Sequence, residues 1–128
     1  MLDKLYSIVV PVMNEEGNIN FMYERVKNTM EKIGSNFEII FVDDGSKDSS
    51  LDKMIEINRK DDRVKVVELS RNFGHQVAVT AGIDHAKGDA IVMIDGDLQD
   101  PPEFIENLII KLNEGYDVVY ATRAERKG

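Results

Sequence analysis

Three aspartates follow a short apolar segment in the stretch IVMIDGDLQD, residues 91–100. Asp95 and Asp97 are separated only by Gly96, which lets the backbone turn, and Gln99 lies two residues further on. Carboxylates this close repel one another unless a positive charge arrives. Hard oxygen ligands of this kind suit Mg²⁺ or Mn²⁺, which often bridge to substrate phosphates. The spacing therefore predicts a divalent metal site at Asp95 and Asp97, with Gln99 as a third candidate ligand.

The residues after this pair also suit the start of a helix. Asp100 is a good N-cap, Pro101 fits the first helical position, and Glu103 lies three residues after the cap. We therefore interpret Asp100 and Glu103 as structural residues. An Asp-x-Asp pattern is common and weak by itself, but here it directly ends a predicted buried strand.

Apolar runs alternate with amphipathic stretches along the whole chain. Nearly continuous, β-branched runs predict buried strands, and apolar residues at three- and four-residue steps predict helices. The predicted strands cover 5–12, 37–42, 64–69, 90–94 and 116–121, and the predicted helices cover 19–33, 51–57, about 76–86 and a segment from Pro101 onward. This alternation implies βαβ crossovers, and hence an α/β fold with a mainly parallel sheet flanked by helices.

Polar residues gather after the predicted strands. Ligands of such sheets bind beyond the carboxyl ends of the strands, where the strand order reverses. The segments at these ends are rich in acidic and amide groups: 11–16, 43–46, 70–75 and 95–100. The opposite connections, 34–36 and 87–89, have the composition of plain turns. This asymmetry predicts a ligand site at one edge of the sheet.

Several of these polar residues also have a structural interpretation. Residues 43–46 could form a turn that leads to a helix cap, and Asn14 and Glu16 could cap the first helix. His75 stands at a predicted helix start, where local hydrogen bonding is the simpler interpretation. His85 lies in the middle of a predicted helix and receives no function.

Length and composition exclude several classes of protein. A chain of 128 residues fits one domain with one core. The formal net charge of -8 argues against a nucleic acid partner, because phosphate backbones require clustered Lys and Arg. The absence of cysteine excludes disulfides and thiolate metal sites. No signal peptide is visible, and no apolar run approaches the ~20 residues that span a bilayer, so we expect no membrane attachment within this chain.

With these motifs the chain resembles the inverting GT-A glycosyltransferases of family 2. It is most similar to the branch that charges polyprenyl phosphates, which includes dolichol-phosphate mannosyltransferase and the bactoprenol glucosyltransferases. The resemblance covers essentially all of the chain and rests on VPVMNEE, FVDDGSKDSS, LSRNFGHQVAVTAGIDHAKGDAIVMIDGDLQDPPE and YATR, in this order. The long third block is far more specific than Asp-x-Asp. The resemblance implies a Rossmann-like GT-A nucleotide-sugar-binding domain over residues 1–128.

The resemblance also implies a donor site along the predicted edge. The residues that would bind the nucleotide-sugar follow the strand ends: Pro11, Val12, Met13, Asn14, Glu15, Asp43, Asp44, Asp95, Gly96, Asp97 and Arg123. Asp44, assisted by Asp43, would reach the base. Many relatives have tyrosine where this chain has Met13, which can pack beside the base as an apolar wall but cannot stack on it as an aromatic ring.

The implied chemistry is metal-dependent transfer with inversion from a nucleotide-sugar, with a UDP-sugar favoured, to a polyprenyl phosphate. Asp95 and Asp97 would be the catalytic pair, with Asp97 and Gln99 on Mg²⁺ or Mn²⁺ and Asp95 near the ribose or a metal-bound water. The metal would act as a Lewis acid on the diphosphate leaving group. The oxygen of a lipid-phosphate acceptor is already largely ionised near neutral pH.

Relatives of this kind continue well beyond 128 residues. We therefore expect the chain to be the N-terminal, cytoplasmic fragment of a longer protein at the cytoplasmic face of the membrane. Membrane contact would occur only through segments outside this chain. The fragment would bind donor and metal but turn over poorly or not at all.

Five other classes are alternatives, and one of them is a non-enzymatic binding module, which a donor-binding fragment would resemble in practice. A GT-A transferase with a saccharide acceptor for cell-surface polysaccharide stays open, and so does a nucleotidyltransferase, although that class usually has a glycine-rich basic loop after the first strand. A dinucleotide-binding oxidoreductase needs a glycine fingerprint there, and 11–16 has none. A receiver domain needs its acidic pair after the first strand, whereas Asp43 and Asp44 follow the second.

Overall fold

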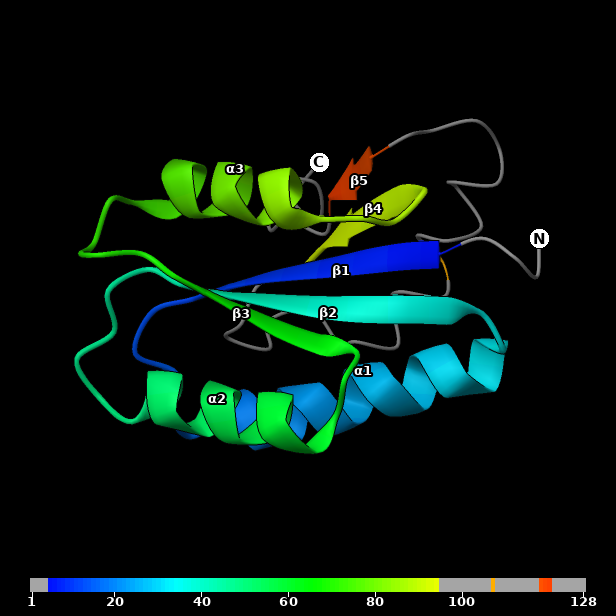
Figure 1. The fold of residues 1–128 in the computed structure, drawn as a ribbon, viewed down its shortest axis with the longest axis horizontal. Coiled ribbons are helices and arrows are strands. Elements are labelled where there is room, and N and C mark those ends of the chain that lie inside the picture. Colours follow the sequence, from blue (N-terminus) through cyan, green and yellow to red (C-terminus); the bar gives the residue numbers. More distant parts are fainter. Residues whose placement is uncertain (1–4, 95–106, 108–117, 121–128) are drawn as a thin grey trace.

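A five-stranded parallel sheet with helices on both faces forms the fold (Figure 1). The computed structural model describes residues 5–94, 107 and 118–120. The elements in chain order are β1 (Leu5–Val12), α1 (Ile19–Ile33), β2 (Asn36–Asp43), α2 (Ser50–Lys60), β3 (Val64–Glu68), α3 (His75–His85), β4 (Ala90–Met93) and β5 (Val118–Tyr120). The strand order is β3-β2-β1-β4-β5.

The predicted α/β class and element positions are confirmed for the described residues. The bounds of β1 and α1 are those predicted, and the other elements within residues 5–94 differ from the prediction by one to three residues at an end. The predicted strand 116–121 is confirmed over Val118–Tyr120, and its ends lie outside the described residues. The predicted helix from Pro101 onward lies outside the described residues. Within the described part of the chain, no helix is long and apolar enough to cross a bilayer.

Alternation along β1 and β2 divides the core into two layers. Ile8, Val10 and Ile39 pack with the apolar stripes of α1 and α2 on one face of the sheet. Val9 and Ile40 pack with Ala78 and Val79 of α3 on the other. Because successive side chains of a strand point to opposite faces, strands covered on both faces must be apolar almost throughout, as the sequence of β1 and β2 is.

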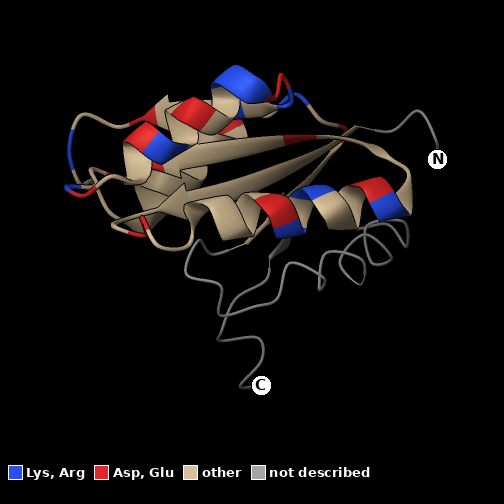
Figure 2. Cartoon of the chain, turned by 90° about the horizontal axis from the view of Figure 1, so that it is seen from below, with Lys and Arg blue, Asp and Glu red and all other residues tan. Residues whose placement is uncertain are grey.

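The outer faces of the helices opposite α3 are charged. Lys and Arg are interspersed with Asp and Glu along both helices of this face (Figure 2). Lys27 lies 3.7 Å from Glu24, and Lys60 lies 4.0 Å from Glu56. This mixture of signs is typical of a solvated helical surface.

The strand order reverses between β1 and β4. Their described pairing ends at Met93, with one further bond from the Ile94 amide to the Val9 carbonyl at 3.0 Å. The backbone N–H and C=O groups of residues two apart on a strand point to the same neighbouring strand. The backbone of Pro11 is therefore turned toward β4, like that of Val9, and lies beyond this last bond. A proline at this position breaks no hydrogen bond of the described β1–β4 pairing, because that pairing uses no N–H from residue 11. Pro11 therefore marks the switch point at which ligands of such sheets bind.

A buried polar network closes the opposite end of the sheet. Glu38 is 3% exposed; its Oε2 accepts hydrogen bonds from the Ser7 hydroxyl at 2.5 Å and the Lys87 amide at 2.7 Å. Lys65 Nζ lies 2.7 Å from Oε1. The Gly88 amide donates to Ser7 Oγ at 2.8 Å, and a Cβ on Gly88 would lie 2.5 Å from that same oxygen. The interpretation of 87–89 as a plain turn was therefore wrong, because this segment ties β4 to β1 and β2.

The network should make folding sensitive to acid. Burial alone would raise the pKa of Glu38, but the hydrogen bonds from Lys65, Ser7 and the Lys87 amide outweigh it and hold that pKa below its ordinary value. A lowered pKa in the folded chain adds stability above the unfolded pKa, and that stability is lost as the pH falls through the folded pKa. We expect Glu38→Gln to lower the free energy of unfolding by about 1.5–3 kcal/mol at pH 7.

Urea unfolding from pH 7 to pH 3 measures this effect. The difference between Glu38→Gln and the unsubstituted chain should shrink below about pH 4.5, the ordinary value of this carboxyl. Glu56→Gln is the control, because Glu56 is 67% exposed and should change the stability little at any pH. A difference that is independent of pH would contradict the assignment.

Candidate functional site

Three connections meet at the carboxyl edge of the sheet. They are the β1–α1 loop (residues 13–18), the β2–α2 loop (44–49) and the β3–α3 loop (69–74), and all three lie at the left of Figure 1. Because β1, β2 and β3 are parallel and adjacent, their carboxyl ends coincide. The predicted gathering of polar residues is thus confirmed for the first three strand ends.

Hydrogen bonds join the β1–α1 and β2–α2 loops. Each bond pairs a backbone amide of one loop with a side-chain oxygen of the other loop or of the first residue of α2: Asn14 N to Ser46 Oγ at 2.9 Å, Lys47 N to Asn14 Oδ1 at 2.7 Å, Glu15 N to Ser50 Oγ at 2.8 Å, Glu16 N to Asp48 Oδ2 at 3.2 Å and Ser49 N to Glu16 Oε1 at 2.8 Å. The first loop donates three of these amide hydrogens, and the second loop donates the other two. The two loops therefore form one unit.

This pairing corrects the capping interpretation of Asn14 and Glu16. The N-cap of α1 is Asn18, and no side-chain hydrogen bond caps that helix. Asn14 and Glu16 accept amide hydrogens from the β2–α2 loop instead. The Glu15 side chain accepts a bond from the Asn18 amide nitrogen Nδ2 at 2.8 Å.

Two buried aspartates lie where β2 ends and the β2–α2 loop begins. Asp43 is 2% exposed and its Oδ1 accepts the Ser46 amide at 3.2 Å, which is the predicted turn. Asp44 is 5% exposed and its Oδ1 accepts the amides of Phe73 at 2.9 Å and Gly74 at 3.3 Å. Asp44 thus holds the residues that lead into α3. Both carboxylates are thus fixed at the carboxyl end of β2, next to the end of β1.

Gly45 allows the second and third loops to approach closely. Its φ is +80°, a conformation that favours glycine. A Cβ at this position would lie 2.5 Å from the Asn72 backbone nitrogen and 2.7 Å from the Arg71 carbonyl carbon. Only a residue without a side chain fits there.

A pocket of about 370 Å³ lies between the second and third loops. Its lining residues come from the two loops, the ends of β2 and β3, and the first turn of α2: Asp43, Gly45, Ser46, Lys47, Leu51, Glu68, Leu69, Ser70, Arg71 and Asn72. Beside it, Asn72 Nδ2 donates to the Met13 sulfur at 3.6 Å. Met13 is half-buried, and this contact brings it to the third loop.

The edge is predominantly acidic. Glu15, Glu16, Asp44 and Asp48 lie within the first two loops, and Asp43 is the last residue of β2. Although burial acts to raise the pKa of Asp48, hydrogen bonds from Ser50 and the Glu16 amide lower that pKa overall. A diphosphate that approached this edge would meet repulsion unless a cation neutralised it. The charge of the edge therefore fits a ligand that binds together with a divalent cation.

The described residues do not form a metal site of their own. Within residues 5–94, 107 and 118–120, no group of three or more His, Cys, Asp or Glu side chains is arranged to hold a metal ion. The predicted metal ligands Asp95, Asp97 and Gln99 lie outside the described residues, and so do Gly96 and Arg123. Asp95 directly follows Ile94, whose amide is bonded to β1.

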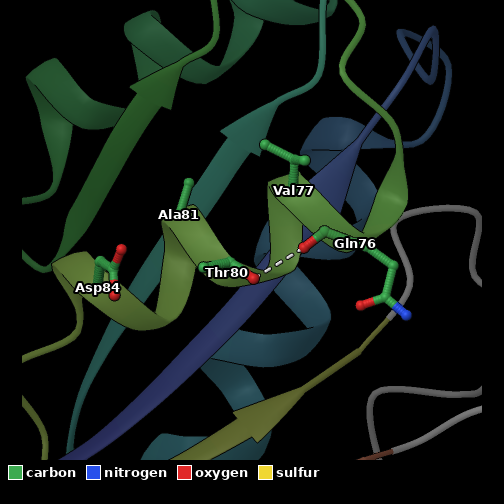
Figure 3. A pocket seen from close by; sticks show the side chains of 5 residues that line it. All are labelled: Gln76, Val77, Thr80, Ala81 and Asp84. Carbon is green, nitrogen blue, oxygen red and sulfur yellow. Dashed lines mark hydrogen bonds between the residues drawn. The ribbon is translucent and has the colours of Figure 1, made fainter.

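A second pocket, of about 310 Å³, lies on α3. Gln76, Val77, Thr80, Ala81 and Asp84 line it (Figure 3). The Thr80 hydroxyl donates to the Gln76 carbonyl at 3.0 Å within the helix. All five residues come from one helix, and the pocket shares none of them with the loop site, so we assign it no function.

Sequence reasoning placed the strand ends correctly but missed residues that hold them. Asp48 and Ser50 were not singled out, and Ser46 was named only as part of a turn, although each accepts an amide hydrogen from the first loop. Their only signal was the string GSKDSS, whose small polar side chains commonly bond to nearby backbone. Pro11, Val12 and Met13 lie at the predicted strand end, beside Asp43 and Asp44.

Comparison with known sequences identifies relatives over almost the whole chain. A glycosyltransferase of Bacillus subtilis that is itself uncharacterised is 57% identical over 123 residues, which are 96% of this chain and 38% of that protein. An undecaprenyl-phosphate 4-deoxy-4-formamido-L-arabinose transferase of Salmonella typhimurium is 39% identical over 125 residues, 97% of this chain and 38% of that protein. The chain thus spans about two fifths of the length of these curated relatives.

Solved glycosyltransferase structures share the fold. Glucosyl-3-phosphoglycerate synthase of Mycobacterium tuberculosis matches with a TM-score of 0.69 and 26% identity, over 85% of this chain and 41% of that chain. Staphylococcus aureus TarS in complex with UDP matches with a TM-score of 0.64 and 25% identity, over 85% and 32%. A mannosyltransferase of Pyrobaculum calidifontis in complex with GDP-Man and Mn²⁺ has a TM-score of 0.69 at 20% identity, over 84% and 32%, a likeness of fold alone.

The sequence profile of one family matches residues 7–128. That match includes β1 from Ser7 onward, the paired loops and the stretch from Asp95 to Asp97. The fold is the Rossmann-like GT-A fold of the structures above. The chain belongs to glycosyl transferase family 2.

Proposed function

We propose that this chain is the donor-binding part of a glycosyltransferase that transfers a sugar from a nucleotide-sugar to a polyprenyl phosphate. The observation that carries the proposal is the convergence of three strand-end loops around buried Asp43 and Asp44, next to the strand β1 that borders the switch point. Ligands of open α/β sheets bind beyond the carboxyl ends of the strands near such a point. Membership of a glycosyltransferase family gives the site its ligand class.

The nucleoside would lie along the carboxyl ends of β1 and β2. Asp44 would accept a hydrogen bond from the base, and Asp43 would support it. The strand end from Pro11 to Glu15 would form the wall of the pocket, with Met13 as its apolar part. A uridine nucleotide is favoured because two solved structures of the same fold, each 25% identical to this chain, are complexes with UDP. Arg123 would contact the donor.

Asp95, Asp97 and Gln99 would hold Mg²⁺ or Mn²⁺. Their carboxylate and amide oxygens suit these ions, and the acidic edge requires a counter-charge for a diphosphate. A bound divalent cation would neutralise the diphosphate as it leaves. Asp95 directly follows Ile94, whose amide is bonded to the Val9 carbonyl of β1, so the diphosphate of the donor would be held near the end of β1.

The lipid acceptor is proposed from one relative. The Salmonella protein, 39% identical, is named as a transferase to undecaprenyl phosphate. A phosphate nucleophile that is already ionised needs positioning more than a strong base. A saccharide acceptor and nucleotidyl transfer remain the alternatives.

A graft tests this function. In the Bacillus relative, the matched 123 residues would be replaced by this chain, because 57% identity favours correct packing. We expect the graft to transfer sugar from a UDP-sugar to undecaprenyl phosphate in the presence of Mn²⁺. The 128-residue chain alone should bind the donor but transfer little or nothing.

The same graft carrying Asp97→Ala is the matched control and should be inactive. Transfer to a saccharide but not to the lipid phosphate would show that the acceptor is a saccharide. Transfer of the nucleotidyl group with release of diphosphate would show that the reaction is nucleotidyl transfer and not sugar transfer. Robust transfer to lipid phosphate by the 128-residue chain alone would contradict the proposal that this chain binds the donor but needs further segments for transfer.

A further inference from the structure

Asn14 has an unusual backbone conformation. Its φ is +55°, and among the described residues other than glycine it alone has a positive φ. This left-handed region costs most residues roughly 1 kcal/mol or more, and asparagine less. Asn14 is also exposed, so burial of its side chain does not explain the conformation. The conformation must be stabilised by specific contacts.

Those contacts are two hydrogen bonds to the second loop. The Asn14 amide donates to Ser46 Oγ at 2.9 Å. The Asn14 carbonyl oxygen Oδ1 accepts the Lys47 amide at 2.7 Å. The left-handed turn allows Asn14 to bond Ser46 through its amide and the adjacent Lys47 through its side-chain oxygen.

Ser46 extends this pairing to the buried carboxylate. Its hydroxyl accepts from Asn14, and its amide donates to Asp43 Oδ1 at 3.2 Å. A continuous path of hydrogen bonds therefore runs from the first loop to Asp43. The path ends beside Asp44, whose own Oδ1 is held by the third loop.

We infer that Asn14 is a positioning residue, whose side chain holds the Lys47 amide while its backbone holds Ser46, and which thereby fixes the orientation of the Asp43–Asp44 pair and sets the affinity for a nucleoside diphosphate. The inference rests on the proposed function and revises one part of it, since Asn14 was predicted to touch the donor itself. Its Oδ1 is already engaged with the Lys47 amide, and its amide with Ser46. Asn14 acts on the ligand through the second loop.

Two substitutions separate the hydrogen bond from the backbone conformation. Asn14→Gly keeps the positive φ without strain and removes the Oδ1 acceptor. Asn14→Asp keeps an acceptor at the same place and tolerates the left-handed region. We expect Asn14→Gly to weaken UDP binding by roughly threefold to tenfold, the fold-change that corresponds to one lost hydrogen bond. Asn14→Asp should bind within about twofold of the unsubstituted chain at 0.5 M salt, where the added charge is screened.

Asn58→Ala is the matched control. Asn58 Nδ2 donates to the Val64 carbonyl at 2.7 Å, which is also a bond between an asparagine side chain and the backbone but lies at β3, away from the loop pairing. Its loss should lower the melting temperature about as much as Asn14→Gly does and leave the UDP affinity unchanged. This comparison separates positioning from general destabilisation.

Hydrogen exchange of the Lys47 amide, measured by NMR without nucleotide, gives a readout that does not depend on binding. It should accelerate severalfold in Asn14→Gly and stay slow in Asn14→Asp and Asn58→Ala. Unchanged exchange in Asn14→Gly, or UDP affinity equal to that of the unsubstituted chain, would overturn the inference. Equal weakening by Asn14→Gly and Asn14→Asp would also overturn it, since a direct contact with the ligand would then be indicated. If the unsubstituted chain bound neither UDP nor GDP, the proposed function would fail and the affinity role of Asn14 with it, whereas the loop pairing would still be judged by exchange.

Discussion

Asp97→Ala is expected to abolish the Mn²⁺ dependence of UDP binding and to weaken that binding by roughly a hundredfold or more. The estimate follows from metal sites in which even supporting residues change affinity by about 10- to 100-fold. Without Asp97 the diphosphate would face Glu15, Glu16 and Asp48 with too little counter-charge. Calorimetric titration with UDP, with and without Mn²⁺, measures the change.

Asp100→Asn is the control for that substitution. Asp100 was interpreted as an N-cap, and asparagine caps helices about as well as aspartate. It removes one negative charge from the same stretch but should leave the metal dependence intact. If Asp97→Ala kept Mn²⁺-dependent binding, or if Asp100→Asn lost it, the assignment of the metal ligands would be wrong.

Gly45→Ala is expected to have the largest effect on folding. The new Cβ would impose the left-handed strain of a φ of +80° and would also overlap the Asn72 backbone nitrogen at 2.5 Å. These two costs together correspond to about 2–4 kcal/mol of lost free energy of unfolding. The second and third loops would have to separate, so UDP binding should fall as well. Urea unfolding measures the first effect and titration the second.

Gly34→Ala separates the two costs. Gly34 has a φ of +85°, but nothing lies within 4 Å of the Cβ that alanine would add. This substitution at the end of α1 should therefore show the conformational strain alone, about 1–2 kcal/mol. If Gly45→Ala destabilised the chain no more than Gly34→Ala, the close approach of the loops would not contribute to stability.

The strands and helices were predictable because their cause is local. The near-continuous apolar run of β1 and the periodic stripe of α1 each report which faces are buried, and the bounds of both agree with the structure. The gathering of Asp43 and Asp44 with the first loop was also predictable. It follows from parallel connection alone, since every strand of such a sheet ends at the same edge.

The pairing of the loops was not predictable, because its partners are distant in sequence. Asn14 and Glu16 have the composition of helix caps, and only the fold brings Lys47 and Ser49 within bonding distance of them. The segment at Gly88 likewise has the composition of a simple turn, whereas its contact Ser7 lies 81 residues away. In both places a local preference is overridden by a tertiary hydrogen bond.

The central claim is that this edge of the sheet binds a nucleoside diphosphate together with a divalent cation. Calorimetric titration of the 128-residue chain with UDP and with GDP, each in the presence and absence of Mn²⁺, tests it most directly. We expect UDP to bind with Mn²⁺ and to lose most of its affinity when the metal is chelated, and GDP to bind more weakly. Absence of binding by both nucleotides, or binding that does not respond to Mn²⁺, would contradict the claim.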